Sequence, residues 1–429
     1  MFGFANFLLL ALFAAAVFDL IFALARGGGL RGALHGLWNT PHLLFGQQLA
    51  EWRLQLGRIL FAAGLAAYEI SVVFCNSMAR QNWAWVQGVM SPVLEWLAFL
   101  CLGAKILFGT RYTWRELLAG GALYFIARWV YFNSQNIWWI GIVVAVLAAK
   151  DVPLRRPLQV YFASGCAAMA VVLALHFAGI VAPDLTSERM GALRGTYGYG
   201  HPNTFGGLVF GLVLAYALLR AQKVRWVDCL LVFAVGVFLL VGPASRSAAL
   251  CTLALAVGLV FCRLRAGHSV PRWWPGTCAG MVGLTAAVSY LLPLLVIKVG
   301  PWNNDIGPAW LAKLDSLLTC RISLTWMAYR LLDVKIAGQV FNWPTVDNSF
   351  AFALFQFGPV VAALLGILFA AALWGHAKQG RRVEVCCLFA MLAYAYMEVQ
   401  PFHLTTNPTA LLLCGAVFAQ TSARWQKIE

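Results

Sequence analysis

The chain has 429 residues, of which 62% are hydrophobic and only 11% are charged. Soluble domains carry about a quarter of charged residues, so this composition excludes an ordinary soluble domain and indicates a membrane protein. The formal net charge is +15, but the Lys and Arg residues lie in short segments between apolar runs, as the positive-inside rule predicts, and they do not indicate a nucleic-acid partner.

Apolar runs long enough to cross a bilayer as helices recur along nearly the whole chain. A helix of about 20 residues crosses the roughly 30 Å of hydrocarbon. The sequence therefore predicts one all-α polytopic membrane domain over residues 1–429, with about 12 to 13 transmembrane helices. The predicted spans are residues 4–24, 58–78, 91–109, 115–132, 135–149, 158–182, 204–221, 228–243, 247–262, 276–297, 349–374, 384–400 and 408–421.

The first run lacks a basic leader region and a small-residue cleavage site, so we expect a retained helix rather than a signal peptide. Residues 32–50 fit an interfacial or re-entrant segment as well as a loop. We divide the chain into N-terminal helices over residues 1–182 and a second half over residues 183–410 that carries the polar motifs described below.

The eleven cysteines are scattered, without a Cys-x-x-Cys pair, and nearly all lie inside apolar runs. This pattern is typical of small buried hydrophobic residues. It predicts neither a disulfide framework nor a zinc site, and no metal or cofactor is expected.

Basic residues alternate between loops and thereby predict how the chain threads the membrane. The loops around residues 150–156, 220–225, 263–272 and 378–382 are rich in Lys and Arg and are expected in the cytoplasm. The loops 183–203, 244–246, 298–348 and 401–407 must then face outside. Their polar residues include Arg194, Ser245, Arg246, Asp315, Arg321, Arg330, Asp347, Asn348 and Glu398.

Arginine on the outer side runs against the usual charge bias and costs up to about 2.5–3.5 kcal/mol at the centre of a membrane helix, so an anionic partner is expected. The spans near residues 204, 247, 349 and 408 begin on this side, with capping candidates at Asn203 or Thr204, Ser245 or Ser247, Asn348 or Ser349, and Asn407. Helix N-termini bind anions, and the forked guanidinium matches phosphate oxygens. Together, Arg194, Arg246 and Arg321 predict a diphosphate site.

Each of these features also has a purely structural explanation. Caps occur on any helix, and Arg246 at a membrane edge can extend to the lipid headgroups. The stretch RGTYGYGHPNTFGG, residues 194–207, can be a turn loosened by glycine, with Tyr197 and Tyr199 as interfacial anchors. However, these polar residues all lie in loops or helix starts that are expected on the outer side of the membrane. This shared location favours a binding site over separate structural roles.

The loop 298–348 is longer than a connection in a compact domain usually is. Its apolar residues at 310, 311, 314, 317, 318, 322, 326 and 327 follow a helical rhythm. One or two amphipathic helices in the membrane interface are predicted, and a solvated hairpin is the alternative.

The order of these motifs resembles that of bacterial oligosaccharide repeat-unit polymerases of the O-antigen polymerase and O-antigen ligase group. The resemblance covers about residues 185–410 and rests on R-G-x-x-G-Y-G-H-P-N, S-R-S, L-D-x-L-L-T-x-R-I, D-N-S-F, and the Glu and Asn-Pro that flank the last predicted span. It implies a multi-pass glycosyltransferase of the bacterial cytoplasmic membrane, with its active site on the outer face. Such an enzyme transfers a glycan from an undecaprenyl diphosphate carrier to a hydroxyl of a lipid-linked acceptor, and the ligases of the group need no nucleotide sugar or metal ion.

The resemblance also implies roles for single residues. Arg194, Arg246 and Arg321 would bind the diphosphate, and the base would be Asp347, with Glu398 second and His201 third, although His201 before a proline also fits a structural turn. The ligases have a histidine motif where this chain has Asp347 and Asn348, which favours a polymerase over a ligase. The direct displacement of the ligases implies inversion at the anomeric carbon. The remaining residues expected to contact the substrate are Tyr197, Tyr199, Asn203, Ser245, Asp315, Arg330 and Asn348.

Two other classes of function stay open. A flippase or transporter of the same lipid-linked oligosaccharide must also bind a diphosphate, but the chain has no evident internal repeat, and its polar residues gather near one membrane face. A scaffold in a polysaccharide-assembly complex would leave the arginines unexplained. Membrane lipid and other assembly proteins are the further partners expected, and nucleic acid is not.

Overall fold

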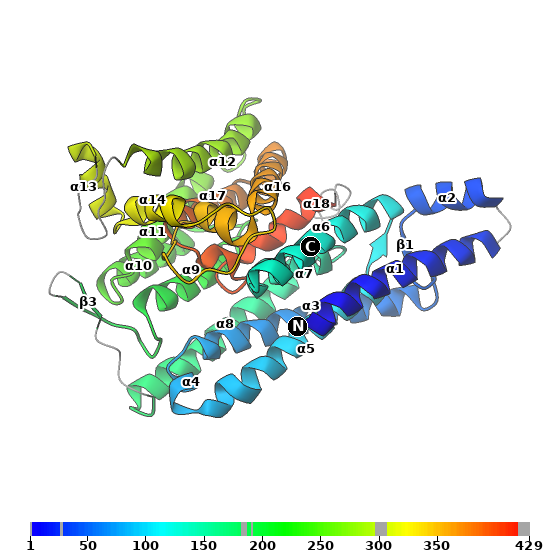
Figure 1. Cartoon of the computed structure of the whole chain (residues 1–429), viewed down its shortest axis with the longest axis horizontal. Coiled ribbons are helices and arrows are strands. Elements are labelled where there is room, and N and C mark those ends of the chain that lie inside the picture. The colour runs from blue at the N-terminus through cyan, green and yellow to red at the C-terminus, as the bar shows by residue number, and fades with distance from the viewer. Residues whose placement is uncertain (1, 26–28, 182–186, 190–191, 297–306, 419–429) are drawn as a thin grey trace.

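The computed structural model describes residues 2–25, 29–181, 187–189, 192–296 and 307–418. Parts of the predicted loops 183–203 and 298–348, residue 182, residue 297 and the end of the last predicted span from residue 419 lie outside the described residues. The described chain is almost entirely helical, in agreement with the predicted all-α class (Figure 1).

The first half of the chain supplies the helices on the right and at the bottom of Figure 1. They are α1 (Phe2–Ala25), α2 (Gly29–Asn39), α3 (Ala50–Cys75), α4 (Ala79–Asn82), the π-helix η1 (Val86–Met90), α5 (Ser91–Phe108), α6 (Trp114–Ser134), α7 (Ile137–Ala148) and α8 (Arg155–Phe177). Strands β1 (His42–Leu43) and β2 (Arg111–Tyr112) pair antiparallel beside them.

The second half begins with the antiparallel strands β3 (Ser187–Arg189) and β4 (Ala192–Arg194). Its helices are α9 (Pro202–Leu219), α10 (Trp226–Val241), α11 (Arg246–Leu264), α12 (Trp274–Leu291), η2 (Leu292–Leu295), α13 (Ala309–Leu317), α14 (Arg321–Leu331), α15 (Ser349–Phe352), η3 (Ala353–Phe357), α16 (Pro359–Lys378), α17 (Arg382–Met397), η4 (Gln400–Phe402), η5 (Pro408–Leu413) and α18 (Cys414–Val417). Helices α13 and α14 lie in the predicted loop 298–348, and their place in the membrane interface stays a prediction.

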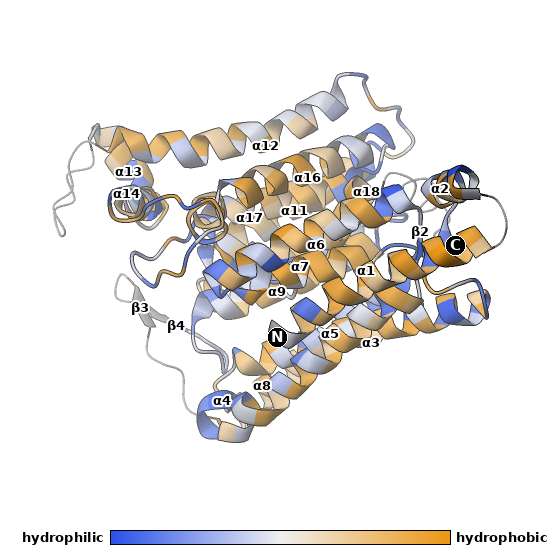
Figure 2. Ribbon diagram, turned by 45° about the vertical axis from the view of Figure 1, so that its right-hand side comes forward, coloured by the Kyte–Doolittle hydropathy of each residue, from blue (hydrophilic) through white to orange (hydrophobic). Residues whose placement is uncertain are grey.

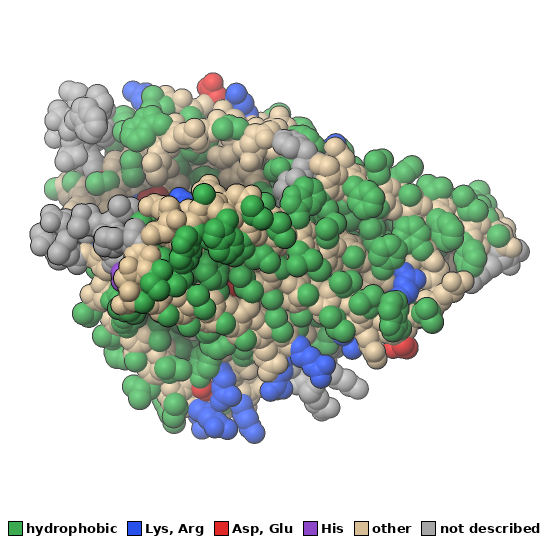
Figure 3. Space-filling model, turned by 90° about the horizontal axis from the view of Figure 1, so that it is seen from below, with side chains coloured by type: hydrophobic (Ala, Val, Ile, Leu, Met, Phe, Trp, Pro, Cys, Tyr) green, Lys and Arg blue, Asp and Glu red, His purple; other side chains and the backbone are tan. Residues whose placement is uncertain are grey.

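Eight helices among the described residues are long and apolar enough to cross a membrane: α1, α3, α8, α9, α11, α16, the continuous segment η1–α5, and the segment α12–η2. Hydrophobic residues predominate along most of the helices (Figure 2), and apolar side chains cover much of the face shown in Figure 3. Outward-facing apolar side chains on so many long helices are typical of a multi-pass membrane protein.

The predicted number of about 12 to 13 spanning helices is higher than this. Helices α7, α10 and α17 have only 12, 16 and 16 residues, and α6, at the predicted span 115–132, is not among the eight. The described part of the predicted span 408–421 is a 3₁₀-helix followed by one α-turn, too short to cross a membrane. The predicted span 349–374 does contain a spanning helix, α16, but this helix begins later than expected, because Gly358 adopts a positive φ of 87° before Pro359.

Helix α7 lies at the centre of the core. Its residues from Trp139 to Ala148 are all buried, and it contacts α5, α6, η4 and η5. Helix α3 packs against α5 and α8, while α11 packs against α9, α10 and α17. The contacts of α11 with α9 and α17 bring one end of each of these three helices together. These ends carry the polar residues of the second half.

Candidate functional site

The stretch RGTYGYGHPNTFGG connects β4 to α9. Tyr197 and Gly198 both have positive φ angles, 52° and 82°, which reverse the chain before Pro202 starts the helix. The ring of Tyr197 stacks on Phe205 with centroids 5.0 Å apart. Tyr199 is fully buried in the core formed with α8 and α9, so the structure does not support its predicted contact with a substrate.

Glycines on α9 allow other segments to approach its backbone closely. A methyl group added at Gly206 would lie 2.2 Å from Ser245 Oγ, and one at Gly207 would lie 1.8 Å from Gln400 Oε1. A Cβ at Gly211 would lie 2.6 Å from the carbonyl oxygen of Thr405. The glycines therefore allow the start of α11 and the segment after α17 to pack closely against α9, as small residues do between membrane helices.

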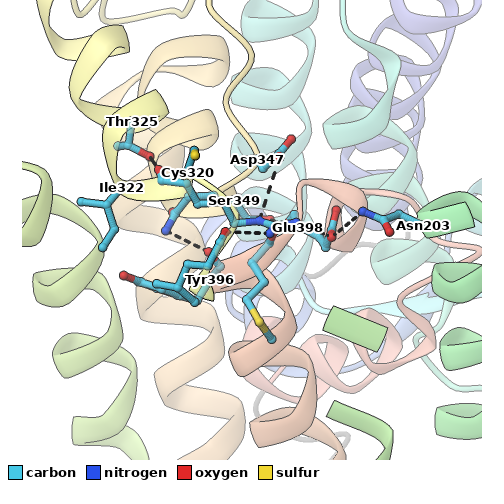
Figure 4. Close-up of polar contacts among 12 residues, drawn as sticks. Asn203, Cys320, Ile322, Thr325, Asp347, Ser349, Tyr396 and Glu398 are labelled. Atoms are coloured by element: carbon cyan, nitrogen blue, oxygen red, sulfur yellow. Dashed lines mark hydrogen bonds and ion pairs between the residues drawn. The ribbon is translucent and has the colours of Figure 1, made fainter. Parts of the chain in front are cut away.

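Glu398 is the centre of the polar network that forms where these elements meet (Figure 4). It follows α17 directly and is 5% exposed. Its Oε1 atom accepts from Arg321 Nη2 at 2.6 Å and from Asn203 Nδ2 at 3.1 Å, and Ser247 also hydrogen-bonds to it. One carboxylate thus joins α9, α11, α14 and α17.

Arg321, the first residue of α14, is 8% exposed. Besides Glu398, its nitrogens donate to the carbonyl oxygens of Leu318, at 2.9 Å, and of Met397. Its Nε atom lies 3.9 Å from Asp347 Oδ2. Since each of its nitrogens contacts a protein oxygen, this geometry favours a positioning role for Arg321 over the predicted contact with a diphosphate.

Asp347 reaches the network from the segment between α14 and α15 (Figure 4). Its side chain is 32% exposed, whereas that of Glu398 is 7% exposed. Asp347 is therefore the more accessible carboxylate of the two. A base must reach the hydroxyl that it deprotonates, so the exposure favours Asp347 over Glu398 for that role.

Arg194 joins the network from the other side, at the end of β4. Its Nη2 atom donates to Asn203 Oδ1 at 2.9 Å and to the carbonyl oxygen of Ala244 at 3.3 Å. Asn203 therefore bridges Arg194 and Glu398. Because Arg321 holds the same Glu398 oxygen, two of the three predicted diphosphate-binding arginines converge on one network.

Arg246 begins α11, two residues after the carbonyl that Arg194 binds, and it is half-buried. Ser245 was expected to cap this helix, but its side chain makes no cap hydrogen bond, and its Oγ atom has no partner among the described residues. Ser247, in the first turn, hydrogen-bonds to Glu398. The N-terminus of a helix carries partial positive charge and favours an anion.

His201 is the N-cap of α9. Its Nδ1 atom accepts from the backbone N–H of Asn203 at 3.1 Å, so the cap is His201 and not the predicted Asn203 or Thr204. Burial of part of the ring and the nearby Arg194 lower the pKa of His201, against an opposite effect of Asp347. The lowered pKa favours the neutral ring, and the hydrogen bond to Asn203 favours a cap over a base.

Burial raises the pKa of Glu398 to about 7, because the loss of water outweighs the opposing effect of Arg321. Asp347 adds to the increase, while Ser247 and Arg194 oppose it. The proton of Glu398 is therefore exchanged near neutral pH, within a site whose arginines outnumber its carboxylates.

Two predicted substrate contacts are instead helix caps. Asp315 is fully buried, and its Oδ1 atom accepts from the backbone N–H groups of Ile322, at 2.7 Å, and Ser323, at 3.2 Å. Asn348 is 4% exposed and accepts from the N–H groups of Phe350 and Ala351. The Asp315 cap fixes α14, which carries Arg321, and the Asn348 cap fixes α15, which follows Asp347. Asp315 and Asn348 themselves are therefore without access to a substrate.

Arg330 lies away from the network. It is exposed, and its guanidinium lies over the ring of Trp326, 5.4 Å from the centroid. Of the predicted polar residues, the structure thus brings together Arg194, Asn203, Arg321, Asp347 and Glu398, with His201 and Arg246 at the adjoining helix ends.

Sequence reasoning missed two residues that complete the network. Ser349 donates from Oγ to the carbonyl oxygen of Glu398 at 2.6 Å. Gln400 donates to the carbonyl oxygen of Asn203 at 3.2 Å and accepts from Tyr394 at 3.0 Å. The signal that was available for Gln400 is the pair Glu398 and Gln400, two polar residues separated by one residue in an otherwise apolar segment before Pro401.

Within the described part of the chain, no three His, Cys, Asp or Glu side chains lie close enough to hold a metal ion together. The network offers guanidinium groups, a helix N-terminus, an accessible carboxylate and a carboxylate that titrates near neutral pH. No family model matches the chain, and neither a curated protein nor a solved structure matches it.

Proposed function

We propose that the protein is a membrane glycosyltransferase that polymerises lipid-linked oligosaccharide repeat units. The observation that carries this proposal is the convergence of Arg194, Arg321 and Asp347 on the buried Glu398, at one end of the membrane helices. Such a site combines what the reaction needs, namely positive charge for a departing diphosphate and a carboxylate for the incoming hydroxyl.

The donor in this proposal is a glycan linked to undecaprenyl diphosphate, and the acceptor is a hydroxyl of another lipid-linked unit. The acceptor oxygen attacks the anomeric carbon while the bond from that carbon to the diphosphate oxygen breaks. The electron pair of that bond leaves with the diphosphate, and Asp347 takes the proton of the hydroxyl. The displacement is direct, so the anomeric configuration is inverted.

The diphosphate is assigned to Arg246, the N-terminus of α11 and Arg194. Three arginines against two carboxylates leave the site positive by one charge when both acids are ionised. A proton on Glu398, whose pKa is about 7, increases that excess. Charge on the leaving group is therefore stabilised by preorganised donors in a partly dehydrated site. Arg321 and Asn203 position Glu398, and the site faces the outside of the cytoplasmic membrane.

The proposal is tested with purified protein, a lipid-linked repeat unit, and no nucleotide or added metal. The expected product is a ladder of longer glycans. Arg194→Ala should reduce the ladder by about 10²–10³-fold, the usual effect of losing one donor to a developing anion. The control is Arg80→Ala, because Arg80 is exposed on α4, next to the turn that contains Gly198, and its side chain donates to the nearby carbonyl of Cys75.

Two outcomes would contradict the proposal. One is the absence of a ladder with the correct substrate. The other is transfer of the intact lipid-linked unit across a proteoliposome membrane without chain growth, which would identify a flippase. Equal activity in Arg194→Ala and Arg80→Ala would remove Arg194 from the site.

A further inference from the structure

A second polar region lies at the other end of the same helices. A cavity of about 820 Å³ opens where α9 and α11 end and where α8 and α17 begin. Glu398 follows the C-terminus of α17, whereas Arg382 is its first residue. The 16 residues of α17 separate the two regions by about 24 Å, so this cavity is distinct from the candidate site.

Basic side chains from four segments line this cavity. They are Arg155, Arg220, Lys223, Arg263, Arg381 and Arg382. The acidic residue in the lining is Glu384. Arg220 is already paired with Asp228, at 3.1 Å, and Arg382 donates to the carbonyl oxygens of Arg265 and His268. The other four have no carboxylate within ion-pair distance among the described residues, so the cavity holds an excess of positive charge.

Two helix N-termini add to this excess. Helices α8, of 23 residues, and α17, of 16 residues, both begin at the cavity, and their N-cap residues, Leu154 and Arg381, make no side-chain cap hydrogen bond. In the first turn of α17, the Glu384 side chain accepts from its own backbone N–H. The macrodipoles of α8 and α17 direct positive ends to the same space as the guanidinium groups. Like charges and dipoles repel each other here unless an anion lies between them.

A buried histidine provides an independent indication of a ligand. His376 lines the cavity and is only 8% exposed. Its ring hydrogen-bonds to the backbone of Leu412, but its Nδ1 atom has no partner among the described residues. A buried ring nitrogen without a partner is costly, so a bound molecule or ordered water is expected beside it.

The composition of the walls narrows the class of ligand. The positive-inside rule explains why loops on one side are basic, but it does not explain why they surround a cavity. The volume falls within the range of about 300–1,000 Å³ that is usual for small-molecule sites. Leu158, Leu218 and Leu412 form part of the wall, so an apolar portion of a ligand can lie against them.

We propose that this cavity binds a phosphate-bearing molecule with an apolar portion. Arg263, Arg381 and Lys223 contact the phosphate, and the leucines contact the apolar portion. Forked guanidinium groups and helix N-termini match phosphate oxygens well. The phosphate belongs either to a phospholipid headgroup or to a soluble phosphate ester, and this inference does not depend on the proposed function.

The test compares the purified wild type with the double variant R263Q/R381Q and with R272Q as a matched control. Arg272 is exposed in the loop before α12 and does not line the cavity. The lipid arm uses phosphatidylcholine nanodiscs with and without phosphatidylglycerol and measures bound lipid by native mass spectrometry. The soluble arm titrates glycerol 3-phosphate and isopentenyl diphosphate against detergent-solubilised protein and measures the unfolding temperature.

Retention of phosphatidylglycerol over phosphatidylcholine assigns the cavity to a lipid headgroup, and stabilisation by a soluble probe assigns it to a soluble ester. In either case the double variant should bind at least about tenfold more weakly, as expected for lost charge-assisted contacts, and R272Q should bind as the wild type does. The proposal is overturned if no probe binds, or if the double variant binds as well as R272Q. The unfolding temperature of each variant without ligand verifies that it folds.

Discussion

Asp347→Asn should slow chain extension by about 10²–10⁴-fold, the usual contribution of a general base. Asparagine has nearly the same shape but cannot take the proton of the acceptor hydroxyl. The assay is the ladder of glycans formed from a lipid-linked repeat unit, followed over time. Binding of the donor should change much less than the rate, because the diphosphate is assigned to Arg194, Arg246 and α11.

The matched control is Asp333→Asn, since Asp333 is an exposed acid in the same connecting segment between α14 and α15. Its ladder should equal that of the wild type. Wild-type activity in Asp347→Asn would show that Asp347 is not the base. In that case Glu398, which titrates near neutral pH, becomes the leading residue for the role.

Glu398→Ala should destabilise the folded protein by about 3–5 kcal/mol, because it breaks a buried ion pair and leaves Arg321 with only the more distant carboxylate of Asp347, at 3.9 Å. It also removes the acceptor of Asn203, at 3.1 Å. Thermal unfolding in detergent should show a clearly lower midpoint. Chain extension should be lost as well, because Arg321 and Asn203 are no longer held.

Glu51→Ala is the control for this change. The side chain of Glu51 is 86% exposed and contacts Arg111 at 3.5 Å, and exposed pairs of this kind contribute about 0–1 kcal/mol. A midpoint of Glu398→Ala equal to that of Glu51→Ala would contradict the role of Glu398 as the centre of the network.

The same side chain links stability to pH. In the unfolded chain Glu398 loses its proton near its ordinary pKa of 4.5, whereas in the folded protein it keeps the proton up to about pH 7. Between these values the folded state binds more protons than the unfolded state, so the free energy of unfolding decreases as pH rises. The unfolding midpoint should therefore fall between about pH 5 and pH 8, and Glu398→Gln should flatten this dependence. An equal slope in the variant would assign the pH dependence to other groups.

Much of the architecture could be predicted because hydrophobicity is a local property of the sequence. The long apolar runs gave α1, α3, α5, α8, α9, α11 and α12 near their observed positions. The prediction was wrong where a local break overrides hydrophobicity, as at Gly358 before α16, or where an apolar segment is buried by protein and need not be a long helix, as at Pro408–Leu413. An apolar run that is buried by protein has the same composition as one that crosses the membrane, so composition alone does not distinguish them.

For the candidate site, the sequence predicted which residues lie together but not the role of each residue. The predicted threading grouped Arg194, Arg321, Asp347 and Glu398 on one side, and these residues do lie in one network. Spacing along the chain did not distinguish Asp315 and Asn348, which cap helices, from their neighbours Arg321 and Asp347. Residues that cap helices and residues that bind a substrate are of the same types, carboxylates and amides, and lie in the same loops. Only their hydrogen-bond partners distinguish the two roles.

The sequence by itself determined that this chain is a helical membrane protein and which loops share a side, because the cost of placing polar groups in hydrocarbon acts on each segment separately. The tertiary structure alone decided that Glu398 joins Arg321 to Asn203, that Ser245 does not cap α11, and that four basic segments line a cavity. Those features depend on distances between segments up to about two hundred residues apart, and such distances follow from the packing of α9, α11 and α17 rather than from local composition.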